Sequence, residues 1–548
     1  MKIYSGLLIE ITKLLKKYSI NEVVEMRISK FKNFDYQINL FVQYSSHKDI
    51  KKILEELISI LNNSKLIESF EVTDNFFINL RVNAQNIINK LVDVEKNIKT
   101  DTPKDLIIDY GGPNIGKPLH VGHLRPLNIG RSIYATNRIV GNNILSDIHL
   151  GDWGMPVAQI ITYCDDENIE IEKLTIEILE EIYPKASSKY KSDEVFRTNA
   201  LNTNKQLSTG HLETVSKWKS LRELTLSTLK NTLTLLDHDF DFWWGESTVN
   251  DIIPKMLEEL FDNSKIEEDE GAFISSQITN PRILITKSDG SYLYITTDLA
   301  TVILRNKKIP HEKVLYVTDN RQKLHFEQLF QSIEYFQFPT KDYNHVGFGT
   351  INDSNGNPLK TRDGGNLKLT DLYMQTFKYI EEINNTLSIE DINGLTNTVL
   401  TFSDLITNRK TDYKFDLEKF TSVSGKTGIY IQYAQVRAKR IIEATGMEAI
   451  NSKIEVPSHL DNIDRNLIVN LANIELFLEM SIKNSEPHHL ANYLYEISNL
   501  FNTFYQESNI KNMENKNKKI TKIFITNLFI KYSHLLMQCL GIKPVEKM

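Results

Sequence analysis

Residues 106–132, LIIDYGGPNIGKPLHVGHLRPLNIGRS, concentrate side chains that could act on a phosphate. His120 and His123 stand three residues apart, Lys117 precedes them, and Gly122 lacks the Cβ that would keep a flat ring from the backbone. Imidazoles and an ammonium group at a helix start suit negative charge that builds on a phosphate under in-line attack. A lone histidine of this kind is more often a helix cap. The full pattern Pro-Asn-x-x-Lys-x-x-His-x-Gly-His indicates nucleotidyl transfer.

The elements around these residues predict a βαβ unit. DLIIDY (105–110) is typical of a buried strand, the next residues of a turn-rich loop, and NILSDIHL (143–150) of a second strand. The helix between the strands is expected to end at Gly141 and, because Pro126 cannot donate to the carbonyl of Gly122, to begin no earlier than about Gly122. Ligands of such a unit bind where the first strand meets the helix N-terminus. The loop is neither a Walker A motif nor a Gly-x-Gly-x-x-Gly fingerprint.

The composition is that of a globular protein with several domains. With 548 residues, 41% of them hydrophobic and 25% charged, the chain exceeds what one core usually serves. Cys164 and Cys539 are the two cysteines, which excludes a disulfide framework and a four-cysteine zinc site and fits a reducing compartment. No apolar run approaches the roughly 18 residues that a membrane span requires, and the start lacks a signal-peptide pattern. We therefore expect a cytoplasmic protein without a membrane anchor.

Three segments differ in their pattern of helices and strands. Residues 1–98 predict a small N-terminal α+β domain. Residues 99–370 alternate apolar strands with helices, as in a Rossmann-like parallel sheet, interrupted by a helical insertion at about 165–285. Residues 371–548 have helical periodicity and predict an all-α bundle. The N-terminal domain is expected to have strands at 23–29, 36–44, 67–74 and 76–82.

Net charge also differs among three parts of the chain. It is +3 for residues 1–100, −13 for residues 101–400 and +3 for residues 401–548. An acidic centre could favour a cationic small substrate, and basic ends could meet a polyanion. Solvated faces of uneven composition explain such a distribution about as often. Charge alone therefore leaves the partners open.

Several segments, in order along the whole chain, resemble the arginyl-tRNA synthetases. These are class I aminoacyl-tRNA synthetases with a His-x-Gly-His at the first βα turn, here in PNIGKPLHVGHLR and followed by HLGDWG at 149–154. The later landmarks are FDFWWGES (240–247), KSDGSYLYITTDLA (287–300), LYVTDNRQKLHF (315–326), LKTRDGGNLKLTDL (359–372), GKTGIYIQYAQVRA (425–438) and the end LGIKPVEKM. One such segment would be suggestive. The ordered set makes the resemblance specific.

One family signature is absent from the sequence. LKTRDGG stands where the Lys-Met-Ser-Lys-Ser loop of class I enzymes belongs. Many arginyl enzymes share this loss, and the resemblance implies that Lys117 supplies the missing positive charge. It implies that Lys360 and Arg362 assist there in binding ATP. The other ATP-binding residues that it implies are His120, Gly122 and His123.

The resemblance also implies a pocket for arginine. A guanidinium needs planar, bidentate carboxylate acceptors, because a single point charge would not separate arginine from lysine. Asp298, with Tyr294 one helical turn before it, and Glu246 occupy the family's side-chain recognition positions. Taken alone, either carboxylate would more often be a surface residue or a helix cap. The positions that hold the α-amino and carboxylate groups of arginine are matched by Asp109, Asn114 and Gln322.

Both ends of the chain acquire RNA-binding roles from the same resemblance. The N-terminal domain is similar to the family's tRNA-elbow-binding domain, and the C-terminal bundle to its anticodon-binding domain. Aromatic side chains can stack on splayed bases while neighbouring cations meet phosphates, although aromatic pairs at helical spacing are more often core. The candidates for tRNA contacts are Tyr430, Gln432, Tyr433, Arg437 and Arg440.

The resemblance implies an arginine–tRNA ligase activity. ATP, L-arginine and arginine tRNA would give arginyl-tRNA, AMP and pyrophosphate through an arginyl-adenylate, formed after tRNA binds. Lys117, His120 and His123 are the expected catalytic residues. Mg²⁺ is expected to travel with ATP, without a dedicated protein metal site. We expect the protein to act as a monomer.

Two other functions stay open on the sequence. A different nucleotidyltransferase of the same fold would fit the histidine pair, but small transferases need no RNA-binding ends and most other synthetases lack GDWG. A non-catalytic, synthetase-like RNA-binding protein would fit the ends, but such proteins tend to lose Lys117, His120 and His123. Assays of tRNA charging with each amino acid would distinguish these functions.

Overall fold

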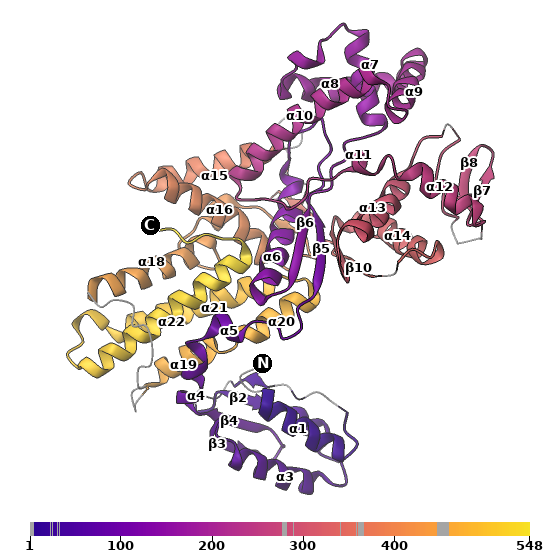
Figure 1. The fold of residues 1–548 in the computed structure, drawn as a ribbon. Coiled ribbons are helices and arrows are strands. Elements are labelled where there is room, and N and C mark those ends of the chain that lie inside the picture. Colours follow the sequence, from indigo (N-terminus) through magenta and orange to yellow (C-terminus); the bar gives the residue numbers. More distant parts are fainter. Residues whose placement is uncertain are drawn as a thin grey trace.

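A computed structural model describes residues 5–548 apart from 22, 23, 25, 30, 32, 277–281, 289, 340, 354, 358, 360–366 and 446–459. A central parallel sheet lies between the N-terminal domain, at the bottom of Figure 1, and a helical insertion at the top. Helices of the C-terminal half pack along one side of the sheet. This arrangement confirms the predicted fold class.

The N-terminal domain is built on an antiparallel sheet of strand order β1-β2-β4-β3. Its strands are β1 (Arg27–Ile28), β2 (Tyr36–Ile38), β3 (Ile67–Val72) and β4 (Ile78–Val82). Its helices are α1 (Ser5–Lys17), α2 (Leu40–Gln43), α3 (Ile50–Asn63), α4 (Ala84–Leu91) and α5 (Val94–Asn97). Ile38, Leu57 and Leu80 are buried in one cluster, so the sheet and α3 share an apolar core.

The strand predicted for residues 36–44 is wrong in its second half. β2 ends at Ile38, and Leu40–Gln43 form the short helix α2. The apolar alternation suits a strand as far as Ile38, but residues 40–42 are three consecutive apolar residues, which a half-buried strand cannot place on one face. The helical turn brings Phe41 into the core, where it is 1% exposed.

The central sheet has four parallel strands in the order β10-β9-β5-β6. They are β5 (Asp105–Tyr110), β6 (Asn143–Asp147), β9 (Lys313–Val317) and β10 (Asp342–His345). Ile107 of β5 pairs with Leu145 on one side and with Val314 on the other. Leu106 and Ile108 belong to one apolar cluster and Ile107 to another, so both faces of β5 are covered. This double burial explains the continuous apolar run of the strand.

The helix after the histidine pair has the bounds that the sequence predicts. A 3₁₀ turn, Val121–His123, comes first, and α6 (Leu124–Val140) follows. Gly141 ends the helix with φ of 95°, a left-handed conformation that glycine adopts without steric cost. β5, α6 and β6 together form the predicted βαβ unit.

The insertion follows β6 and is mainly helical. Its helices are α7 (Met155–Asp166), α8 (Ile176–Ser192), α9 (Glu194–Ser208), α10 (Leu212–Leu235), α11 (Glu246–Val249) and α12 (Ile253–Asp262). A hairpin of β7 (Ile266–Asp269) and β8 (Ala272–Ser275) comes next. Ile161, Leu179 and Leu221 belong to a separate apolar cluster, so α7, α8 and α10 have a core of their own. The chain returns to the sheet through α13 (Tyr294–Lys308), and α14 (Lys323–Tyr335) follows β9.

The C-terminal half is a set of packed helices. They are α15 (Leu369–Ile383), α16 (Ile389–Leu405), α17 (Leu417–Phe420), α18 (Gly428–Thr445), α19 (Asn462–Leu471), α20 (Ile474–Asn484), α21 (His488–Ser508) and α22 (Lys516–Leu540). A short parallel pair, β11 (Ile351–Asn352) and β12 (Tyr413–Lys414), precedes α17. Figure 1 shows α18, α21 and α22 running side by side, as in a bundle.

Helix α22 is long and apolar enough, by length and composition, to cross a membrane. The sequence prediction did not identify this helix as a candidate span. In the structure, 67% of its most apolar window is buried. Phe529, Leu536 and Cys539 are fully buried among the neighbouring helices, as in the core helix of a bundle.

Buried ion pairs join the C-terminal helices to the other two parts of the chain. Arg125 of α6 donates from Nε to Asp404 of α16 at 2.9 Å, and both side chains are at most 1% exposed. Arg465 of α19 holds Asp35 of the N-terminal domain with two hydrogen bonds, at 3.0 and 2.6 Å. Bidentate guanidinium–carboxylate pairs fix orientation as well as distance. The contacts therefore place both ends of the chain relative to each other and to the sheet.

Candidate active site

The histidine pair is held by its own backbone just beyond β5. His120 Nδ1 accepts a hydrogen bond from the Gly122 N–H at 3.1 Å, and His123 Nδ1 accepts one from the His120 N–H at 3.1 Å. The ring centroids are 4.1 Å apart and the rings are tilted by 54°. A Cβ on Gly122 would lie 2.8 Å from His120 Cε1. Only glycine therefore lets the His120 ring lie this close to the backbone.

Burial leaves both rings neutral near pH 7. Burial lowers the pKa of His123 to about 3, with a contribution from the neighbouring His120. Burial and the positive charge of Lys117 lower the pKa of His120 below its usual value. Because His120 Nδ1 accepts a backbone N–H, the neutral ring carries its proton on Nε2. His120 therefore presents a donor that can meet a phosphate oxygen.

Lys117 lies between the histidine pair and the insertion. Its Nζ is 3.8 Å from the centre of the Tyr183 ring on α8, a cation–π contact. Partial burial lowers the pKa of Lys117, and its charge reaches His120. The structure thus places Lys117 near His120, and it adds Tyr183 as a neighbour.

The loop that replaces the second family signature is only partly described. Lys360 and Arg362, predicted to bind ATP, lie outside the described residues. The chain just after them is pinned to the histidine loop, because Val121 N–H donates to Leu367 O at 2.8 Å and Leu369 N–H donates to Leu119 O at 2.9 Å. The end of this loop therefore lies next to the predicted phosphate site.

Two carboxylates of the predicted arginine pocket lie close enough for their charges to interact. Glu246 begins α11, and Asp298 lies on α13, one turn after Tyr294. Burial raises the pKa of Glu246 to about 7; His149 opposes the rise and the carboxylate of Asp298 adds to it. Burial and both carboxylates raise the pKa of Tyr294. The structure thus gathers the three predicted side-chain recognition residues in one place.

Asp298 has a partner that the sequence did not predict. His325 of α14 shares a hydrogen bond with it, from Nε2 to Asp298 Oδ2 at 2.6 Å. Asp298 Oδ1 accepts no hydrogen bond from any residue that the structure describes. His325 thereby fixes the carboxylate and leaves one oxygen for a ligand.

The carboxylate of Asp109 forms a buried ion pair with Arg305. Arg305 of α13 donates from Nη2 to Asp109 Oδ2 at 2.5 Å and to Asp147 Oδ2 at 2.7 Å. Burial raises the pKa of Asp109, against the attraction of Arg305. Asp109 is only 9% exposed, so little of its surface is free to meet a ligand.

His149 completes this buried cluster. Burial opposes its protonation, but the contact with Asp147 and the charge of Asp109 raise its pKa to about 9. Ligating atoms of His149, Asp109 and Asp147 lie within 4.8 Å of one another, as a metal ion would require. The guanidinium of Arg305 already bridges the two carboxylates. The group is therefore an ion-pair network rather than a metal site.

Asn114 and Gln322, the remaining predicted arginine contacts, are exposed at loops around the strand ends. The backbone of Asn114 bridges to Gly151 of the GDWG segment, where an added Cβ would lie 2.0 Å from Asn114 Oδ1. Gln322 ends a 3₁₀ turn after β9, three residues before His325. Both positions are open to a ligand.

Three neighbours of the site were missed from the sequence. His325 follows Gln322 at helical spacing inside LYVTDNRQKLHF, which is a signal that could have found it. Arg305 lies two turns after Asp298 on α13 and could have been noted as a buried cation. Tyr183 carries no local signal, because only the folding of the insertion brings it to Lys117.

The candidate tRNA contacts on α18 divide into buried and accessible residues. Gln432 is fully buried and bonded to Thr398 Oγ1 and Lys543 O, each at 2.8 Å. A base cannot reach Gln432 without opening the core, because its side chain is used for packing inside the bundle. Tyr430 is half-buried, and its hydroxyl donates to Asn499 at 3.1 Å.

A basic cleft of about 290 Å³ lies beside the accessible residues of α18. Arg437 lies over the rings of Tyr433, at 4.3 Å, and Tyr505, at 4.8 Å. The cationic residues that line the cleft are Arg437, Arg440, Lys511 and Lys519. Aromatic faces next to cations are what single-stranded RNA requires.

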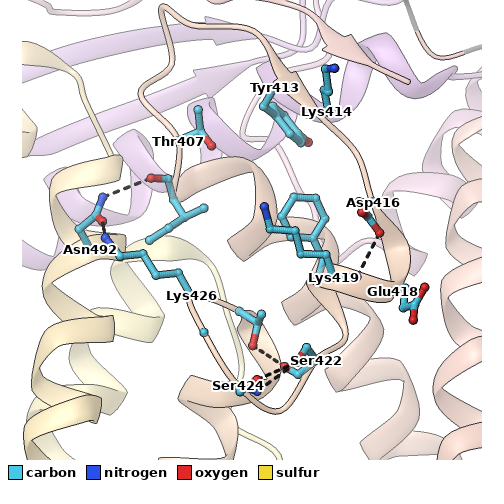
Figure 2. A pocket seen from close by; sticks show the side chains of 14 residues that line it. Thr407, Tyr413, Lys414, Asp416, Glu418, Lys419, Ser422, Ser424, Lys426 and Asn492 are labelled. Atoms are coloured by element: carbon cyan, nitrogen blue, oxygen red, sulfur yellow. Dashed lines mark hydrogen bonds between the residues drawn. The ribbon is translucent and has the colours of Figure 1, made fainter. Parts of the chain in front are cut away.

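A second cavity, of about 750 Å³, lies between α17, the start of α18 and α21. Figure 2 shows Lys419 and Lys426 on different walls, and Lys426 Nζ donates to Asn492 Oδ1 at 2.8 Å. Asp416 and Glu418 balance part of this charge. No sequence prediction pointed to this cavity, whose walls come from residues 406–427 together with Asn492 of α21.

Comparison with protein families agrees with this geometry. Residues 86–417 match the family described as tRNA synthetases class I (R), catalytic domain. Residues 5–82 match the arginyl tRNA synthetase N terminal domain, and residues 431–548 match the DALR anticodon binding domain. The three matches leave few residues uncovered.

Curated and solved relatives carry the same family name. Arginine–tRNA ligases of Francisella tularensis and Agathobacter rectalis are 32% identical to this chain, with 90% of the chain and of each relative covered. The arginyl-tRNA synthetase structure from Plasmodium falciparum has a TM-score of 0.84 at 24% identity, covering 100% of this chain and 99% of that one. The one from Thermus thermophilus has a TM-score of 0.80 at 18% identity, with 99% of each chain covered. Sequence and fold together show that the chain belongs to the class I arginyl-tRNA synthetases, the arginine–tRNA ligases.

Proposed function

We propose that this site joins L-arginine to its tRNA in two steps. The carboxylate of arginine attacks the α-phosphate of ATP, and the bond to pyrophosphate breaks to give arginyl-adenylate. A ribose hydroxyl of the terminal adenosine of tRNA then attacks the arginyl carbonyl, and AMP leaves. The observation that carries the proposal is the pair of carboxylates, Glu246 and Asp298, which lie close enough for their charges to interact. Like the histidine pair, they lie on segments that adjoin strands of the central sheet.

The phosphate end of the proposed site consists of neutral donors and one cation. His120 and His123 would bind the phosphates through ring N–H groups, and Gly122 allows close approach of the backbone. Lys117 would neutralise the charge that develops on the phosphates. Lys360 and Arg362 are proposed to assist from the neighbouring loop. Mg²⁺ is proposed to arrive on the pyrophosphate part of the ATP substrate.

The arginine end of the proposed site matches a guanidinium in charge and shape. Glu246 and the free oxygen of Asp298 would each accept N–H groups, and the exposed Tyr294 would close the pocket. The α-amino and carboxylate groups of arginine are proposed to meet Asp109, Asn114 and Gln322. A neutral isostere would leave the carboxylates without a partner, which is how the site would reject it.

Transfer RNA is proposed to bind along the two ends of the chain. Tyr430, Tyr433, Arg437 and Arg440 remain the proposed contacts on α18. The cleft beside Arg437 has the cations and aromatic faces that an anticodon loop would need. The N-terminal domain is proposed to hold the tRNA elbow.

We expect tRNA charging by the full-length protein to be specific for arginine. Aminoacylation of arginine tRNA would be measured with each of the twenty amino acids and ATP. Lysine should be rejected, because a point charge cannot satisfy two planar carboxylates. Equal charging with lysine, or charging with another amino acid alone, would overturn the proposed pocket.

Lys117→Ala should slow adenylate formation by about 10²- to 10³-fold, roughly 3–4 kcal/mol of lost charge stabilisation in a partly desolvated site. The KM for arginine should hardly change, because Lys117 is proposed to contact phosphate alone. ATP–pyrophosphate exchange in the presence of tRNA measures both quantities. A near-normal exchange rate would remove Lys117 from the mechanism.

Asp298→Asn should raise the KM for arginine by about 10²-fold or more, roughly 3 kcal/mol, while the KM for ATP hardly moves. Asparagine keeps an acceptor for His325 but removes the charge that faces the guanidinium. Asp251→Asn, at an exposed carboxylate beyond α11, serves as the matched control. If the KM for arginine stayed within about threefold, Asp298 would be structural.

The KM for arginine should fall by roughly tenfold between pH 6 and pH 8. The pKa of Glu246 is raised to about 7, so the residue is mostly protonated at pH 6 and mostly ionised at pH 8, and only the ionised form pairs with a guanidinium. Glu246→Gln should raise KM and flatten this profile. A mutant that keeps the full pH dependence would assign the titration to another group.

A further inference from the structure

Helix α8 of the insertion contacts both chain segments that line the phosphate side of the site. Tyr183 lies under the Lys117 ammonium group, at 3.8 Å from Nζ to the ring centre. One turn earlier, Glu180 accepts from Lys368 Nζ at 2.6 Å, and Lys368 follows the partly described loop that replaces the second signature. A single helix from the insertion therefore contacts a lysine on each of these two segments.

The Tyr183 ring also fits closely against the loop that carries Lys117. A Cβ on Gly116 would lie 3.2 Å from Tyr183 Cδ2, and Gly116 has φ of 82°. The Gly116 N–H donates to Thr225 Oγ1 of α10 at 3.1 Å, so the insertion holds this residue by a hydrogen bond as well. Burial raises the pKa of Tyr183, and the neighbouring Tyr294 adds to the rise. Tyr183 thus contacts the lysine loop and lies near Tyr294 of the proposed arginine pocket.

Lys117 has no stronger partner within the part of the chain that the structure describes. No carboxylate there lies within ion-pair distance of its Nζ, whereas Lys368 has Glu180. If Lys117 formed an ion pair with a buried carboxylate, that ion pair would have to break before Lys117 could bind a phosphate. A ring face holds an ammonium group more weakly than a phosphate does. The contact with Tyr183 can therefore be exchanged for ATP at little cost.

We infer that Tyr183 is a positioning residue for Lys117. Its ring holds the ammonium group beside the histidine loop until the phosphates of ATP bind that group instead. The insertion, which carries Tyr183, thereby forms part of the ATP site. A lysine side chain has a flexible four-carbon stem and samples many rotamers when it is free. The contact with Tyr183 restricts the Lys117 side chain to rotamers that keep the ammonium group near His120 before ATP binds. The inference rests on the proposed role of Lys117 at the phosphates.

The test compares Tyr183 variants of the full-length enzyme in ATP–pyrophosphate exchange with tRNA present. Tyr183→Leu removes the ring face, and exchange kcat should fall about 5- to 20-fold while the KM for arginine stays within twofold. Tyr183→Phe keeps the ring face and should retain most of the activity. Tyr183→Met offers a second variant without a ring if the leucine variant does not fold. Thermal unfolding of each variant checks that the fold is intact.

Two further variants separate positioning from a general structural role. In a Lys117→Ala background, Tyr183→Leu should cause no further loss, because the two residues act through one contact. Tyr190→Leu, two turns along the same helix beside Arg197, removes a tyrosine remote from the site and should leave exchange unchanged.

Each result decides a separate claim. Equal losses for Tyr183→Leu and Tyr183→Phe, or additive losses in the double variant, would overturn the positioning role. If Lys117→Ala impaired exchange but Tyr183→Leu did not, this inference alone would fail. If Lys117→Ala itself had no effect, the proposed role of Lys117 would fail first.

Discussion

The ion pair of Arg305 with Asp109 and Asp147 fixes the frame on which the active site depends. The guanidinium is 1% exposed and holds the carboxyl ends of β5 and β6 against α13. Loss of one partner from such a pair leaves a buried charge, at a cost of about 3–5 kcal/mol. β5 leads into the histidine loop, β6 leads into the GDWG segment, and α13 carries Asp298. The phosphate end and the arginine end are therefore placed by one contact.

The GDWG segment extends this frame toward Glu246. Asp152 is fully buried, accepts from Arg222 Nε at 2.7 Å and accepts from the Ser247 N–H and hydroxyl at 2.9 and 2.8 Å. A Cβ on Gly245 would lie 2.6 Å from Asp152 Oδ1, so the glycine before Glu246 is needed for this approach. Asp152 is thus a structural residue. It orients the start of α11, where Glu246 meets the proposed guanidinium position.

The N-terminal domain is joined closely to the C-terminal helices. Arg465 forms a buried ion pair with Asp35. The Tyr36 hydroxyl donates to Asn473 at 3.0 Å, and the Tyr532 hydroxyl donates to the carbonyl of Leu91 at 3.2 Å. The two parts proposed to bind tRNA therefore support each other. Their mild positive charge lies away from the acidic centre, where the cationic amino acid is proposed to bind.

The sequence by itself indicated the family, through the ordered motifs that resemble those of arginyl-tRNA synthetases. It also determined the fold class and the bounds of β5 and α6, because these follow from local spacing, turn chemistry and apolar periodicity. It failed at residues 40–42, where an apolar run folded as a helical turn, and it gave no sign that the Gln432 side chain is buried. Only the tertiary structure decided the partners of the functional groups. Arg305, His325 and Tyr183 reach Asp109, Asp298 and Lys117 from segments far away in the chain. Such contacts depend on how helices pack around the sheet. A local pattern can mark His325 or Arg305 as a candidate, but it does not encode which side chain each one meets.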